Sequence, residues 1–173
     1  LAYLKAMDDP GHGEALKALL AVTPLGVDLE KFRLARNLTS DEAEALWAAT
    51  PMTRLSTGEG AFGFSAGHWT NICEDIKRSL AEWHRGRPDS RGATAHNLRS
   101  IMTLKLRADV LGAVLPRIAT AGTIVFDGAR AGLASHTPKL QEADDKLWCR
   151  VEPVLAQAGP RSLSISELAE TIG

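Results

Sequence analysis

One order of elements occurs twice along the chain, and it limits the fold more than any other feature of the sequence. Two short helical segments are followed by two short apolar runs, which a glycine-rich turn joins. The first pair of runs is Met52–Leu55 and Phe62–Phe64, around the turn at 56–60. The second pair comprises the β-branched run 122–128 and the run 131–135. Each pair is typical of a β-hairpin, so the repeat predicts small units that combine helices with a hairpin.

Periodicity and capping residues predict the helices between these hairpins. The clearest helix follows Ser65, a candidate N-cap. Its apolar residues recur every three or four positions and are Trp69, Ile72, Cys73, Ile76, Leu80 and Trp83. Thr39 with Glu42 predicts a capping box at the start of a shorter helix, and so does Ser164 with Glu167.

Two prolines lie inside patterns that otherwise indicate helices. Pro116 is expected to interrupt the apolar helix predicted over 110–121. Pro153 lies inside a longer pattern that ends before Gly159, and it predicts a kink or a break near Cys149.

Together these elements predict a mainly α protein with small β-hairpins, an α+β chain of tandem winged-helix units. Such a unit is a helix-turn-helix followed by a two-stranded wing. We expect the first unit at 1–67, the second at 68–138, and the start of a truncated third unit at 139–173. Because each unit is too small to bury much core alone, neighbouring units should pack together through the linker helices.

Composition excludes several classes of protein. The 173 residues include 20 Lys and Arg against 21 Asp and Glu, a net charge of −1, which excludes a uniformly basic nucleic-acid coat. Two cysteines without CxxC spacing exclude a disulfide scaffold and favour a reducing, cytoplasmic location. No apolar stretch approaches the ~18 residues that cross a bilayer, so no membrane partner is expected. The chain begins with Leu1 rather than Met, and we expect a piece of a longer protein.

Motifs for catalysis are weak. The run Gly63-Phe-Ser65-Ala-Gly67 matches the G-x-S-x-G nucleophile elbow, but no βαβ alternation supplies the parallel sheet on which that serine acts. An N-cap role for Ser65 explains the same residues better. The chain has no P-loop, and no Cys or His pair has the spacing of a structural zinc site. We therefore expect no catalytic, cofactor-binding or metal-binding residue in this chain, and no enzyme activity.

Positive charge is concentrated in the middle unit. Nine Lys and Arg lie between Lys77 and Arg117, against three Asp and Glu. The candidate nucleic-acid contacts among them are Arg85, Arg87, Arg91, Arg99, Lys105 and Arg107. The alternative is a solvated face whose cations form ion pairs within the protein. We expect no aromatic platform for stacking unpaired bases in this stretch.

Several runs of residues, taken in order, resemble the C-terminal part of bacterial selenocysteine-specific elongation factors (SelB). The first unit contributes Thr23-Pro-Leu-Gly-Val-Asp-Leu and Ala35-Arg-Asn-Leu-Thr39. The second contributes His84-x-x-x-Pro88-Asp89, Leu98-Arg99, Gly122-Thr-Ile-Val-x-Asp-Gly128 and His136-x-Pro138. The third contributes Leu147-Trp-Cys-Arg-Val-Glu-Pro-Val-Leu-Ala-Gln-Ala-Gly159 and Ser166-Glu-Leu-Ala-Glu170. The resemblance covers nearly the whole chain.

The resemblance implies an array of four winged helices behind a translational GTPase part related to EF-Tu. That N-terminal part carries GTP, with magnesium, and selenocysteinyl-tRNA, and the last winged helices bind an mRNA hairpin (SECIS) near a UGA codon. This chain would then be a monomeric spacer that works at the ribosome, between tRNA delivery and the mRNA hairpin. The alternative is a winged-helix DNA-binding regulator of transcription, although Gly112 and Pro116 are poor residues for a major-groove helix.

Overall fold

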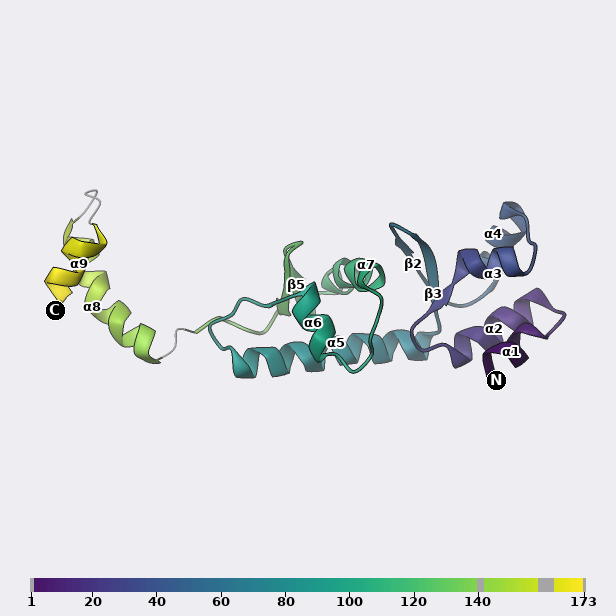
Figure 1. Ribbon diagram of the computed structural model, residues 1–173, viewed down its shortest axis with the longest axis horizontal. Coiled ribbons are helices and arrows are strands. Elements are labelled where there is room, and N and C mark those ends of the chain that lie inside the picture. Colours follow the sequence, from purple (N-terminus) through teal and green to yellow (C-terminus); the bar gives the residue numbers. More distant parts are fainter. Residues whose placement is uncertain (1, 140–141, 159–163, 173) are drawn as a thin grey trace.

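The computed structural model describes residues 2–139, 142–158 and 164–172, and its elements follow one another along one long axis (Figure 1). The first group of elements is α1 (Ala2–Met7), α2 (His12–Val22), β1 (Val27–Asp28), α3 (Leu29–Ala35), α4 (Ser40–Ala49), β2 (Thr53–Thr57) and β3 (Gly60–Phe64). The second group is α5 (Ala66–Gly86), β4 (Ala93–Thr94), α6 (Ala95–Ile101), α7 (Ala108–Ala119), β5 (Ile124–Phe126) and β6 (Arg130–Leu133). The helices α8 (Glu142–Ala158) and α9 (Ile165–Ile172) follow. The expected mainly helical α+β class is confirmed.

The described strands form two small antiparallel sheets with the same topology. One has the order β1-β3-β2 and the other the order β4-β6-β5. The predicted hairpins are present, with Leu55 opposite Phe62 in the first and Phe126 opposite Ala131 in the second. A strand of two residues, β1 or β4, adds to each hairpin as a third member, which was not expected from the sequence. Strands this short have no alternating pattern that a sequence could reveal.

Capping residues set the helix boundaries as predicted. The Ser65 side chain accepts a hydrogen bond from the His68 amide, so this residue caps α5 immediately after β3. Thr39 and Glu42 form the expected capping box at the start of α4. Ser164 and Glu167 make the same pair of bonds before α9.

The expectation that Pro116 and Pro153 would break their helices was wrong. The helix α7 runs through Pro116, and α8 runs through Pro153 without a break near Cys149. A proline removes one backbone hydrogen bond, but the apolar face of α7 is buried along its length and keeps the helix in place. Its buried residues are Val110, Leu111, Val114, Leu115 and Ile118.

The larger apolar core crosses the expected boundary between the first two units. Phe62 and Phe64 of β3 and Leu55 of β2 belong to the same buried cluster as α5 and α7, and β2 lies against α7. The first hairpin therefore packs on the second group of elements, while a separate cluster holds α1 to α4 together. Burial of these aromatic and aliphatic side chains holds the two sheets together through one shared core.

Candidate nucleic-acid interface

The candidate interface lies at the carboxyl end of α5. The helix ends at Gly86, and the Arg87 amide donates to the Trp83 carbonyl over 2.9 Å. The chain then turns back through 87–92 to β4. Glycines at 92 and 132 let this turn lie against β6, since a Cβ on Gly132 would collide with the Arg91 carbonyl oxygen. This close approach places cations from α5, the turn and β6 around one end of the helix.

A hollow of about 630 Å³, which we call the Trp83 groove, opens on one side of the 87–91 turn. Its lining comprises Trp83, Arg87, Asp89, Ser90, Arg91, Asn97 and Arg130. The guanidinium carbon of Arg87 lies 4.1 Å from the centroid of the Trp83 ring, a cation–π contact. The indole Nε1 donates to Ser90 Oγ over 3.2 Å, which fixes the ring. Trp83 thus places an aromatic ring in a groove within the stretch for which no stacking platform was expected.

A second hollow, the His84 groove, borders the same turn at Pro88. Its lining comprises Ala81, His84, Arg85, Pro88, Ser135, His136, Thr137 and Lys139. The rings of His84 and His136 stack with centroids 3.6 Å apart and planes 20° apart. The Lys139 amide donates to the Pro88 carbonyl over 3.0 Å, so the segment after β6 is fixed to the same turn.

His84 joins the groove to the second sheet. Its Nε2 accepts a hydrogen bond from the Leu133 amide over 3.2 Å, which requires that nitrogen to be unprotonated. Burial lowers the pKa of His84, and the neighbouring His136 lowers it further, while the Ser90 backbone opposes the shift. His84 is therefore neutral at neutral pH and adds no positive charge to the grooves.

The structure brings together three of the six residues predicted to contact nucleic acid. Arg85, Arg87 and Arg91 are exposed around the two grooves, and in the described part of the chain no ion pair engages them. Cations at a helix carboxyl end also stabilise the helix dipole, but one or two suffice for that. The contact of these three residues with nucleic acid stays a prediction.

The other three predicted residues make contacts within the protein. Arg99 Nε donates to the Leu106 carbonyl over 2.6 Å, and Lys105 Nζ donates to backbone carbonyls at the end of α6. Arg107 pairs with Asp109 and with Glu59, and its guanidinium carbon lies 5.2 Å from the Phe62 ring centroid. Their contact with nucleic acid stays a prediction. Of the three, Arg107 forms the ion pairs within the protein that the alternative predicts.

Sequence reasoning missed two cations of the interface. Arg130 lies in β6 and Lys139 follows it, and both are remote in sequence from the basic stretch 77–117. Arg130 makes one long hydrogen bond to the Gly92 carbonyl, at 3.4 Å. Only the pairing of β6 with β4, which aligns Arg130 with Thr94, shows that it belongs here.

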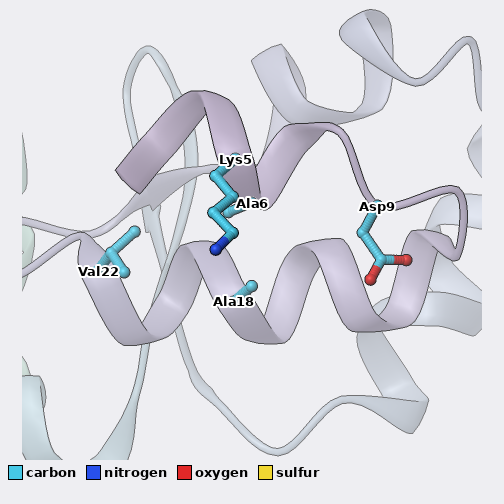
Figure 2. Close-up of a pocket in the computed structure, with 5 residues that line it drawn as sticks. All are labelled: Lys5, Ala6, Asp9, Ala18 and Val22. Carbon is cyan, nitrogen blue, oxygen red and sulfur yellow. The ribbon is translucent and has the colours of Figure 1, made fainter. Parts of the chain in front are cut away.

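The remaining candidate sites carry less chemistry. Ser65 is engaged as an N-cap rather than poised on a parallel sheet. Across the described residues, no three His, Cys, Asp or Glu side chains gather as a metal would require. A hollow between α1 and α2 is lined by Lys5, Ala6, Asp9, Ala18 and Val22 (Figure 2). It holds only two ionisable side chains, one acidic and one basic, and no nucleophile.

The last two findings concern membrane-spanning helices and similarity to known proteins. No described helix has the length and apolar character needed to span a membrane. No family model and no curated protein sequence matches the chain.

Proposed function

We propose that this chain is a non-catalytic winged-helix spacer arm of a SelB-type elongation factor, with an RNA contact at the carboxyl end of α5. In this proposal a GTPase part outside these 173 residues binds GTP, magnesium and selenocysteinyl-tRNA in the cytoplasm. Further winged-helix units bind the mRNA hairpin, and the arm sets the distance between the two at the ribosome.

The repeated topology supports the winged-helix assignment. The order α2-β1-α3-α4-β2-β3 recurs as α5-β4-α6-α7-β5-β6, and both sheets place the last strand between the other two. A helix, a short strand, two helices and a hairpin in this arrangement are the parts of a winged helix. The resemblance of the sequence to the SelB family supplies the rest of the proposal.

The shared core is the observation that carries the spacer role. Leu55, Phe62 and Phe64 of the first hairpin are buried with α5 and α7 of the second group. A dry aromatic and aliphatic contact of this kind resists hinge motion, because bending it would expose apolar surface to water. A stiff connection of this length suits a part whose task is to hold two binding sites apart.

The helices that would read DNA in a winged-helix regulator are poorly suited to it. α4 carries Asp41, Glu42 and Glu44 and no Lys or Arg. At the start of α7, Arg107 forms an ion pair with Glu59 of the first hairpin. A major-groove helix must present cations and donors to phosphates and base edges. These observations favour phosphate contact elsewhere, at the five exposed cations of the two grooves.

The test is RNA binding by the chain, measured as fluorescence anisotropy of a labelled RNA hairpin over a range of salt concentrations. Simultaneous charge reversal of Arg85, Arg87 and Arg91 to Glu should weaken binding at least about tenfold at low salt and flatten the salt dependence. Unchanged affinity and slope would reject the RNA contact.

The matched control changes the same net charge elsewhere. Lys5, Lys17 and Lys31 are exposed on the first group of elements, and their reversal to Glu should have a much smaller effect. Tight, sequence-specific binding of duplex DNA in a gel shift would instead favour the transcriptional regulator.

A further inference from the structure

We propose that the Trp83 groove binds unpaired nucleotides of single-stranded RNA, with a base stacked at Trp83 and the adjoining phosphates on the surrounding arginines. This inference rests on the proposed function and names the class of RNA that the interface takes. It follows from the shape of the groove, from its aromatic floor and from the placement of its cations.

The aromatic floor is the first observation. Trp83 is half-buried, and its ring is held by the indole bond to Ser90 Oγ and covered by the Arg87 guanidinium. A guanidinium over an indole is a cation–π pair to which a base can add by stacking, or in which a base can take the place of the exposed arginine. In a duplex the bases are already stacked on one another, so a duplex gains no stacking contact with the Trp83 ring.

The charge around the floor is the second observation. Arg87, Arg91 and Arg130 line the groove against a single carboxylate, Asp89, which leaves a net charge of +2. Among the described residues, none of the three arginines has an ion-pair partner. Exposed guanidinium groups without carboxylate partners bind phosphate oxygens through two parallel hydrogen bonds.

Polar groups at the edge of the groove can meet the base itself. The Asn97 side chain lines the groove from α6. Among the described residues, the hydrogen bonds of Asn97 use its backbone: the amide donates to Thr94 Oγ1 over 3.2 Å, and the carbonyl accepts from Ser100 Oγ over 2.6 Å. Its carboxamide offers two donors and an acceptor, and Asp89 offers acceptors. Such groups contact the Watson–Crick edge of a base only when that base is unpaired.

The path of the strand is the third observation. The Trp83 groove and the His84 groove both border the 87–91 turn, and in the second groove Arg85 and Lys139 supply two more cations. A strand that leaves the first groove along this turn therefore meets positive charge again. A hollow of about 630 Å³ lined by three cations suits a flexible single strand rather than the convex face of a duplex.

The experiment compares a fluorescein-labelled single-stranded RNA with a duplex of the same length at one salt concentration, using the whole chain. The affinity for the single strand should be at least about tenfold higher than the affinity for the duplex. Trp83→Ala should weaken single-strand binding about 5- to 150-fold and leave duplex binding unchanged. Trp148→Ala removes an exposed tryptophan outside the groove and is the control, for which no change is expected.

A second variant keeps the test decisive if Trp83→Ala fails to fold. Trp83→Phe retains an aromatic floor and should bind the single strand within a few-fold of the parent chain. A saturating single strand should quench the intrinsic fluorescence of the parent chain and of Trp148→Ala but not that of Trp83→Phe, because the indole that the base contacts is gone. Quenching that persists in Trp83→Phe would overturn the inference.

The outcomes separate this inference from the proposed function. Equal binding of single strand and duplex, with both reduced by charge reversal at Arg85, Arg87 and Arg91, would overturn the single-strand inference and leave the RNA contact standing. Failure of both RNAs to bind would overturn the RNA contact and, with it, the inference. Single-strand preference with the expected loss in Trp83→Ala would support both.

Discussion

Asp75 should be the most sensitive polar residue of the second group, and its replacement tests how the turn between α6 and α7 is held. The carboxylate is 3% exposed on α5. It accepts hydrogen bonds from the Leu104 amide over 2.7 Å and the Thr103 amide over 3.3 Å, and it pairs with Arg78. Asp75→Ala leaves two amides without their acceptor, each at about 1–3 kcal/mol, so we expect a loss of about 2–6 kcal/mol.

The comparison with Arg78→Ala makes this prediction specific. The Arg78 side chain is 64% exposed, and removal of an exposed partner should cost no more than about 1 kcal/mol. Urea unfolding followed by circular dichroism measures both free energies, and hydrogen exchange should show faster exchange of the Thr103 and Leu104 amides in Asp75→Ala. A loss below about 1 kcal/mol for Asp75→Ala, or an equal loss for Arg78→Ala, would refute the reasoning.

Three further predictions concern pH, the shared core and a helix cap. The folded-state pKa of His84 lies below its ordinary value of 6.5 because of burial and His136, so stability should be full above about pH 6.5 and fall as the pH drops below it. His84→Gln should remove this dependence in urea unfolding, and an unaltered pH profile would contradict it. Phe62→Ala should cost about 3–5 kcal/mol and destabilise both groups together in one transition, whereas two separate transitions would argue against a shared core. Thr39→Ala should cost about 1 kcal/mol in thermal unfolding, because the Glu42 amide loses its acceptor, and no change would show that water replaces the cap.

Local signals in the sequence were sufficient for most of the helices and hairpins. Ser65 and Thr39 cap their helices as predicted, because capping involves residues only three positions apart. The hairpins likewise depend on a turn and its two flanking runs. The mainly α class with small antiparallel sheets follows from those same local patterns, and it is the part of the fold that sequence reasoning reached.

Contacts between distant residues decided the rest. Pro116 was expected to interrupt its helix, but packing of the surrounding apolar face outweighs one lost hydrogen bond. The short strands β1 and β4 exist only because β3 and β6 offer them an edge.

The candidate interface shows the same division. The sequence by itself placed Arg85, Arg87 and Arg91 together, since they lie within seven positions of one another. Only the tertiary structure shows that Arg130 and Lys139 lie at the same site and that Arg87 contacts the Trp83 ring. It also shows that Arg107 forms an ion pair with Glu59. A sequence records which charges a chain carries, but whether a charge meets a partner or solvent depends on chain segments that folding brings together.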